Sequence, residues 1–272
     1  MTARASDAAA PPDDAIRVYW QTGCTACLRT KEFLARHRVP FLSRDVLADD
    51  GAFAELARFG LRQVPIVTRG DRWANGQVLA DVARVAGIEW GPQPIFPVAE
   101  LHRRLQSILS GARRFAAQIP EARLGELLPD RPRSYATLAY HIFNIAECFL
   151  EHGAGIGLTY DAYNRTAPDR LLATAPLVAY GGDVAMRVAQ WMDGPGRDAD
   201  WNAPANVYYG EQTLHQFLER TTWHSGQHTR QLMWLLRTQF GVEPDDPVPA
   251  AIFAGLPMPE AVWDGVDAAA AK

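Results

Sequence analysis

The amino-acid sequence predicts an α/β domain followed by an all-α domain. Short apolar runs alternate with helical stretches over residues 16–90. Three prolines within residues 92–97 then interrupt every pattern, and from residue 98 onward apolar side chains recur with the 3.6-residue period of helices. A chain of 272 residues is long enough to form two such domains.

The composition excludes several classes of protein. A net charge of −4 leaves no basic surface for nucleic acid or for an anionic membrane. The first fourteen residues are rich in Ala, Pro and Asp, so we expect a disordered tail and not a signal peptide. No later run approaches the eighteen apolar residues of a membrane span. With three cysteines in so long a chain there is no disulfide scaffold, and we expect a cytoplasmic protein.

The first domain is predicted over residues 15–90. Strands are expected at residues 16–20, 41–45, 65–68 and from residue 72, and helices at residues 24–38, 51–59 and 77–86. The resulting order β-α-β-α-β-β-α indicates a small α/β domain with a mixed sheet.

A proline-rich linker is predicted at residues 91–97, because closely spaced prolines cannot continue a helix. Helical stretches follow at residues 98–119, 134–152, 175–193 and 211–240. Four amphipathic helices of this length predict a four-helix bundle within residues 98–245. Residues 246–272 are expected to form a C-terminal extension, first a loop packed on the bundle and then a frayed tail.

Cys24 and Cys27 form a C-x-x-C motif at the start of a predicted helix. The unpaired backbone N–H groups and the helix dipole at this position stabilise a thiolate on the first cysteine. The second cysteine, one turn later, can resolve a mixed disulfide, and Arg29 and Lys31 add positive charge nearby. We therefore predict that both cysteines are catalytic, with Cys24 exposed and of low pKa and Cys27 buried. A pair of inert or metal-binding cysteines is the alternative, although a zinc ribbon needs a second such pair, which the sequence lacks.

Residues 15–88 resemble the glutaredoxin branch of the thioredoxin fold, because the cysteine pair is followed by Val64-Pro65 before a strand and then by Asn75-Gly76. The resemblance implies a cis peptide bond at Pro65 and a Val64 backbone that binds the cysteinyl part of a thiol. Asn75 and Gly76 keep part of the glutathione-site motif and are expected to bind the thiol too. This part of the chain is especially similar to the NrdH redoxins, which implies a thioredoxin reductase as a partner.

Three histidines suggest a second site. His224 and His228 are spaced i, i+4, which puts both imidazoles on one helix face within reach of one divalent ion. His141 lies in the middle of an apolar helix, where an unpaired imidazole would be costly. Solvated or hydrogen-bonded histidines without a metal are the alternative interpretation.

The region around these histidines resembles the DinB-like (YfiT-like) metalloprotein superfamily. The segments that carry the resemblance are residues 133–141 and His224-x-x-x-His228-x-x-Gln231-Leu232, within about residues 98–245. Members are four-helix bundles with three such ligands and often an open metal position. The resemblance implies that His141, His224 and His228 hold a divalent metal, zinc or nickel.

Three further residues lie near these histidines in the sequence and are candidates for a role at the same site. Cys148 follows His141 by seven residues and is expected to be a buried small residue and not a reactive thiol. His215 lies on a different helix face from His224, so we do not expect it to be a ligand. Glu147 is either near the metal ligands or simply exposed.

The two sites together suggest chemistry of low-molecular-weight thiols. A metal with an open position can bind a thiol and present a thiolate nucleophile, and some DinB-like proteins resemble this in function. We expect a thiol S-transferase or a thiol-dependent isomerase that uses glutathione or a similar thiol, with Cys24 handling the mixed disulfide.

Two alternatives remain. The first is a glutaredoxin-type disulfide oxidoreductase with a non-catalytic bundle, and the second is a metal- or ligand-binding stress module. Expected partners are small thiols and an electrophilic or disulfide substrate, and a homodimer is left open.

Overall fold

The computed structural model describes residues 14–265, which divide into two compact units. The first unit contains the chain up to Gln21 together with Thr30–Gly91, and the second contains Thr22–Arg29 together with the chain from Pro92 onward. The division therefore assigns a short segment around the cysteine motif to the helical unit, although this segment lies within the first domain predicted from the sequence. The predicted disordered tail lies outside the described residues apart from Asp14.

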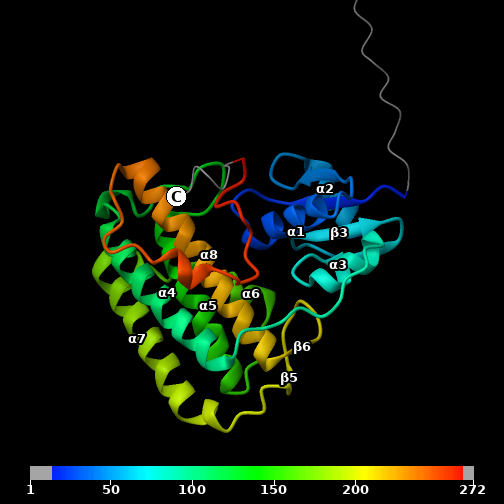
Figure 1. Cartoon of the computed structure of the whole chain (residues 1–272). Coiled ribbons are helices and arrows are strands. Elements are labelled where there is room, and N and C mark those ends of the chain that lie inside the picture. Colours follow the sequence, from blue (N-terminus) through cyan, green and yellow to red (C-terminus); the bar gives the residue numbers. More distant parts are fainter. Residues whose placement is uncertain (1–13, 266–272) are drawn as a thin grey trace, which may run out of the picture. The chain divides into compact units, whose positions relative to one another are not determined.

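The first unit contains a mixed four-stranded sheet (Figure 1). Its elements are β1 (Arg17–Trp20), α1 (Thr25–Arg36), β2 (Leu42–Asp45), α2 (Asp50–Ala57), β3 (Ile66–Arg69), β4 (Arg72–Asn75) and α3 (Leu79–Ala86). The strand order is β2-β1-β3-β4, with β1 parallel to β2 and antiparallel to β3, and β3 antiparallel to β4. The predicted element order is confirmed, with element ends that differ by a few residues.

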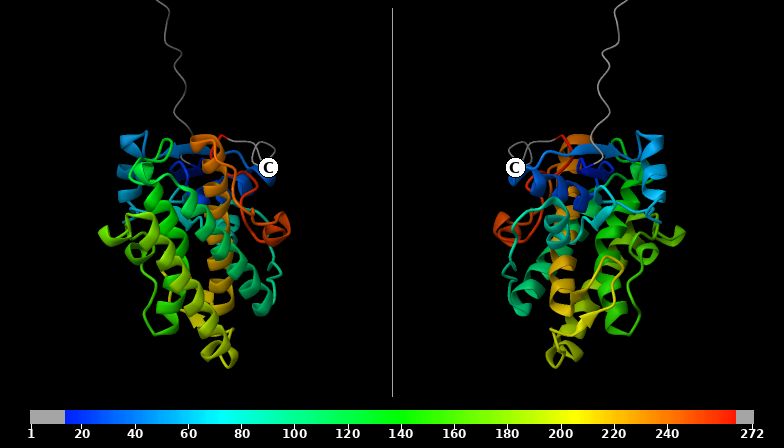
Figure 2. Two further views of the ribbon diagram at one scale, coloured as in Figure 1. Left: turned by 90° about the vertical axis from the view of Figure 1, so that its left-hand side faces the viewer. Right: turned by 90° about the vertical axis from the view of Figure 1, so that its right-hand side faces the viewer.

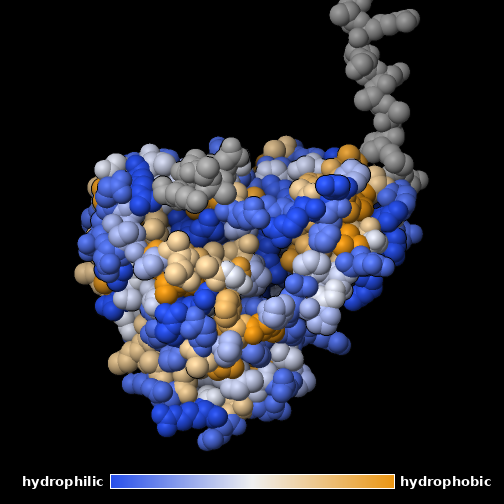
Figure 3. Space-filling model, in the orientation of Figure 1, coloured by the Kyte–Doolittle hydropathy of each residue, from blue (hydrophilic) through white to orange (hydrophobic). Residues whose placement is uncertain are grey.

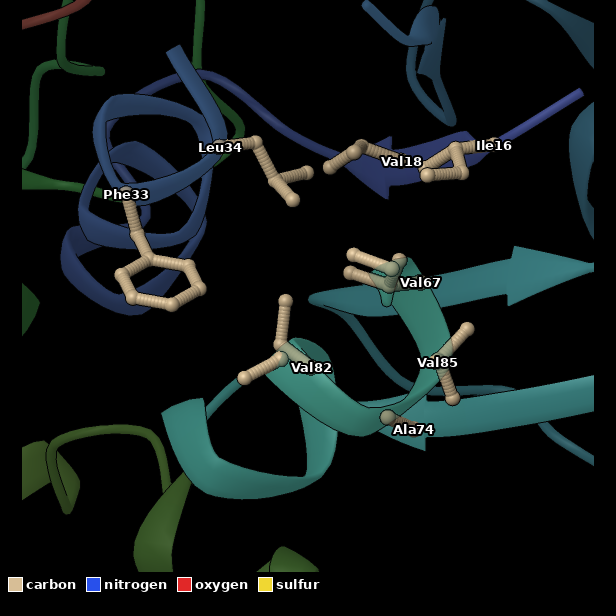
Figure 4. Packing of buried hydrophobic residues seen from close by; sticks show 10 residues of the cluster. Ile16, Val18, Phe33, Leu34, Val67, Ala74, Val82 and Val85 are labelled. Carbon is tan, nitrogen blue, oxygen red and sulfur yellow. The ribbon is translucent and has the colours of Figure 1, made fainter. Parts of the chain in front are cut away.

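Alternating side chains of the strands form a core on each face of this sheet, as the two-residue period of strands requires. Figure 4 shows one core, in which Val18 and Val67 pack with Leu34 of α1 and Val82 of α3. The neighbouring strand residues Tyr19 and Ile66 belong to the core on the other face, with Ala52 and Leu56 of α2.

Long helices dominate the second unit. The α-helices are α4 (Val98–Gln118), α5 (Tyr135–Gly153), α6 (Tyr160–Tyr163), α7 (Thr174–Asp193), α8 (Leu214–Phe240) and α9 (Ala250–Phe253). Short 3₁₀ turns lie at Glu121–Arg123, Asp169–Leu171 and Pro195–Arg197, and a two-stranded ribbon joins β5 (Pro204–Ala205) to β6 (Gln212–Thr213). Helices α4 and α5 each pack against both α7 and α8, and Figure 2 shows these four helices running side by side.

Helix α8 carries clear start and stop signals. The Thr213 hydroxyl accepts a hydrogen bond from the Gln216 backbone N–H at 3.2 Å, and the Gln216 side chain accepts one from Thr213 N–H at 2.8 Å. This capping box begins the helix, and Gly241, in the left-handed conformation with φ 64°, ends it. The predicted start at residue 211 was wrong, because Gln212 and Thr213 pair with the neighbouring strand before the cap.

The segment after α9 packs along α8. The Gln227 side chain donates to the Ala261 carbonyl at 2.9 Å, and the rings of Trp234 and Trp263 stack with centroids 5.5 Å apart. The expected loop packed on the helices is therefore present up to residue 265, and the expected frayed tail at residues 266–272 lies outside the described residues.

The surface shows scattered apolar positions. Large exposed hydrophobic residues such as Leu127, Ile156 and Met186 lie in different parts of the chain. On the face shown in Figure 3, hydrophilic and hydrophobic residues are interspersed. Between residues 14 and 265, no helix is both long and apolar enough to cross a membrane.

Candidate functional site

A disulfide bond joins Cys24 and Cys27 at the first turn of α1. The Cys24 carbonyl accepts the helical hydrogen bond of Leu28 N–H at 3.1 Å, and Cys27 N–H donates to Cys24 Sγ at 3.2 Å. Cys27 is fully buried, whereas Cys24 is partly exposed. The predicted order of exposure is confirmed, and Cys24 is the cysteine of the pair that solvent reaches.

The predicted thiol-binding residues lie in the first unit. The Val64–Pro65 peptide bond is cis, as predicted. The Gly76 N–H donates to the Pro65 carbonyl at 2.9 Å, and the Asn75 side chain accepts from the Gln77 N–H at 3.0 Å. Asn75 and Gly76 therefore have roles in the fold itself, and the thiol-binding role of all four residues stays a prediction.

His141, His224 and His228 converge in the second unit. One ring nitrogen from each lies within 4.8 Å of those of the other two, and all three side chains are buried. His141 comes from α5 and the other two from α8, so the convergence depends on the packing of these helices. The predicted convergence is confirmed, and the predicted role in metal binding remains to be tested.

The outer ring nitrogen of His228 is held in a defined state. Gln231 Nε2 donates to the Val262 carbonyl at 3.1 Å, which leaves Gln231 Oε1 to accept from His228 Nδ1 at 2.7 Å. Because an amide oxygen can only accept, the His228 proton is on Nδ1. Its Nε2 therefore presents a lone pair toward the other histidines, which is the state that a metal ligand needs.

The other two histidines fit the same donor set. His224 Nδ1 lies 2.9 Å from the Tyr163 hydroxyl, and its Nε2 lies 3.1 Å from His228 Nε2. His141 Nδ1 is buried and has no hydrogen-bond partner among residues 14–265. Three buried, closely spaced imidazoles are a donor set of the kind that holds a divalent metal such as zinc.

Three arginines make the surroundings of the histidines electropositive. Burial is the largest cause that lowers the pKa of all three histidines well below the usual value. The charges of Arg133 and Arg220 lower it further for all three, and the charge of Arg131 does so for His141 and His228. The Arg220 guanidinium lies 4.4 Å from the ring centroid of Tyr163 and 4.3 Å from that of Tyr209. The cluster is therefore uncharged in a positive environment, which favours an anionic ligand.

The cysteine motif contacts this cluster within the second unit. The Thr25 hydroxyl lies 2.7 Å from His224 Nε2. The His224 ring stacks on Trp223 with centroids 5.2 Å apart, and the Arg29 guanidinium lies 4.9 Å from the Trp223 ring centroid. Thr25 and Arg29 of the segment Thr22–Arg29 therefore belong to the surroundings of His224.

The residue before the cysteine pair is also held in place. Gly23 N–H donates to the Asp264 carboxylate at 2.9 Å, and Arg131 donates to the Thr22 carbonyl at 3.1 Å. Gly23 has a φ of 67°, and a Cβ there would lie 2.9 Å from the Trp263 ring. Both the conformation and the close contact require glycine at this position.

The three other weighed residues lie outside the cluster. Cys148 is buried, as expected, and burial raises the pKa of its thiol to about 12. His215 Nε2 lies 2.8 Å from the Phe96 carbonyl, so His215 has a structural partner. Glu147 forms an ion pair with Arg187 at 2.9 Å. No local pattern in the sequence singles out Thr25, Tyr163 or the arginines for a role at the site.

Residues 16–73 match the family model described as Glutaredoxin. The match covers less than half of the chain and ends before the helices of the second unit. Comparisons with curated proteins and with solved structures found no match.

The matched region contains the Cys24–Cys27 pair and the strands β1, β2 and β3, and it ends within β4. The match and the cysteine pair together support a thiol-redox function that acts on small thiols or disulfides.

Proposed function

We propose that the protein is a metal-dependent enzyme of low-molecular-weight thiol chemistry, a thiol S-transferase or a thiol-dependent isomerase. A single observation carries the proposal: the disulfide Cys24–Cys27 and the three-histidine cluster lie in one compact unit, with Thr25 in contact with His224. The cysteine pair would exchange disulfides with a thiol, and the three neutral imidazoles would hold a metal ion that binds a thiol. The DinB-like assignment of the helices is part of the same proposal.

Each group has a chemical task. His141, His224 and His228 would hold a zinc or nickel ion, and the bound ion would lower the pKa of a substrate thiol. Tyr163 and Gln231 orient two of the imidazoles through their second ring nitrogens. Positive charge from the nearby arginines favours the thiolate and any carboxylate of the thiol substrate.

The cysteine pair would remove mixed disulfides. The Cys24 thiolate attacks the disulfide R–S–S–R′, which releases R′–SH and leaves R bound through a disulfide at Cys24. The Cys27 thiolate then displaces R–SH and closes the Cys24–Cys27 bond. Two molecules of a small thiol, themselves oxidised to a disulfide, return the pair to the reduced state.

A second candidate function is supported by the family match. The region at residues 16–73 favours a glutaredoxin-type disulfide oxidoreductase, in which the helices have no catalytic part. The two functions differ in whether activity depends on the histidines.

The test uses the full chain and two point variants. Purified protein is loaded with zinc or nickel, its bound metal is measured by elemental analysis, and conjugation of glutathione, bacillithiol or mycothiol to 1-chloro-2,4-dinitrobenzene is followed. His228→Ala should lose bound metal and conjugation at least tenfold while it still reduces a mixed disulfide of glutathione. Cys24→Ser should show the opposite pattern.

His215→Ala is the matched control, because His215 lies on the same helix outside the cluster. It should keep both the metal and the two activities. If His228→Ala conjugates thiols as fast as the unmodified protein, the metal-dependent function is refuted and the disulfide oxidoreductase becomes the better account. Stoichiometric metal without either activity would favour the metal-binding stress module.

A further inference from the structure

Thr25 lies between the two cysteines and is buried, with its hydroxyl on the metal-binding side of His224. The hydroxyl oxygen is 2.7 Å from His224 Nε2, and the same nitrogen is 3.1 Å from His228 Nε2. A zinc ion lies about 2.0–2.1 Å from each imidazole nitrogen that holds it. An ion shared by these two nitrogens would therefore meet the Thr25 hydroxyl at the same lone pair of His224.

We propose that Thr25 is a positioning residue of the three-histidine site: in the disulfide form its hydroxyl competes with the metal for His224, and reduction of Cys24–Cys27 releases it. The inference rests on the proposed metal site and adds that metal affinity depends on the redox state of the cysteine pair. The reduced protein binds the metal more tightly.

The disulfide fixes Thr25 because the bond closes a short ring through its backbone. The segment is also held on its N-terminal side, where Gly23 N–H is bonded to Asp264 and the Thr22 carbonyl to Arg131. With both sides tied, the closed ring holds the Thr25 backbone in the position that places its hydroxyl beside His224. Reduction breaks the S–S bond, consumes two electrons and two protons from two thiols, and removes that tie.

Reduction adds a second effect in the same direction. A Cys24 thiolate, one residue from Thr25, is attracted to a cation on the histidines. Because linkage is reciprocal, a metal that prefers the reduced protein must also make the disulfide easier to reduce. A tenfold difference in metal affinity corresponds to a rise of about 30 mV in the two-electron reduction potential.

The first experiment measures both sides of this linkage on the full chain. Zinc alone is titrated into oxidised protein and into protein reduced with a phosphine, and the reduction potential is measured in glutathione buffers with and without zinc. We expect zinc to bind at least tenfold more tightly to the reduced protein and to raise the potential by about 30 mV or more. Equal zinc affinity in the two redox states would overturn the proposal.

Two variants distinguish the effect of the Thr25 hydroxyl on zinc affinity from the effect of the cysteine thiolates. Thr25→Val removes the hydroxyl and keeps the shape, so its oxidised form should bind zinc several-fold more tightly than unmodified oxidised protein, and the redox difference should shrink. Thr25→Ser keeps a hydroxyl and should retain the full difference. Thr238→Val, on an exposed part of α8, is the matched control and should change neither quantity.

The outcomes distinguish this inference from the proposed function. A full redox difference in folded Thr25→Val would assign the effect to the cysteine sulfurs and overturn the role of Thr25. The comparison of oxidised and reduced unmodified protein still decides the matter if that variant does not fold. Absence of zinc binding in both redox states would refute the proposed metal site and this inference with it, whereas equal binding in both states refutes the inference alone.

Discussion

Replacing Glu219 by Gln should stabilise the protein at alkaline pH and change its stability little near pH 4. Glu219 lies on α8, and burial raises the pKa of its carboxyl from 4.5 to about 7, with partial compensation by the charge of Arg29. The unfolded chain releases this proton at lower pH than the folded protein does. The free energy of unfolding therefore falls as pH rises from 4.5 to about 7, and the loss is complete above that range.

The size of the effect follows from the shift. One pKa unit corresponds to about 1.4 kcal/mol, so the rise from 4.5 to about 7 corresponds to at most about 3.5 kcal/mol. Because the side chain is partly exposed, solvent screening reduces this figure, and we expect about 1–2 kcal/mol at pH 8. Glu219→Gln has no carboxyl to ionise and avoids this cost.

The assay is chemical denaturation of the full chain, followed by circular dichroism between pH 5 and pH 9. The difference in unfolding free energy between Glu219→Gln and the unmodified protein should grow from roughly a quarter of its full value at pH 5 to its full value above pH 7. Glu211→Gln, at an exposed carboxylate just before α8, serves as the control. A difference that stays constant with pH, or that favours the unmodified protein at pH 8, would refute the reasoning.

Three further outcomes are expected. Thr213→Ala removes the capping hydroxyl of α8 and should cost about 1 kcal/mol of stability in thermal melts, with the far-ultraviolet spectrum unchanged. Gly181→Val should cost about 2–3 kcal/mol or more, because a Cβ there would lie 2.5 Å from the Phe143 ring, whereas Gly125→Ala has open space and should be close to neutral. Cys148, which is buried with its pKa raised to about 12, should react with Ellman's reagent only after denaturation; fast reaction in the folded, oxidised protein would contradict its burial.

The sequence was most informative where local periodicity decides the structure. The spacing of His224 and His228 on one helix needs only the geometry of an α-helix, and His141 stood out because its neighbours are apolar. The contact of Thr25 with His224 joins residues 199 positions apart and depends on tertiary packing, so no local sequence pattern predicts it. The first residues of the predicted last helix pair as a strand because an adjacent strand and a capping threonine outweigh helix propensity.

Helix periodicity also accounts for part of the histidine site. Gln231 follows His228 by one helical turn, so its reach to the ring could be inferred from spacing alone. Tyr163 lies in the four-residue helix α6 between irregular stretches, where side-chain direction follows from the fold and not from periodicity. At the predicted thiol-binding motif, both backbone polar groups of Gly76 are already used within the first unit: its N–H donates to the Pro65 carbonyl, and its carbonyl accepts from the Thr30 hydroxyl.

Because Thr22–Arg29 belongs to the helical unit, neither truncation of the chain at the linker nor exchange of its N-terminal region leaves that unit intact. A cut at the proline-rich linker would separate the histidines from a piece of their own surroundings, although every helix of that unit would remain. Recombination that exchanged the N-terminal region for another redox module would likewise replace the residue that touches His224. The two regions are thus expected to change together over evolutionary time, with the residues inside the cysteine motif constrained by the histidines and not by redox chemistry alone.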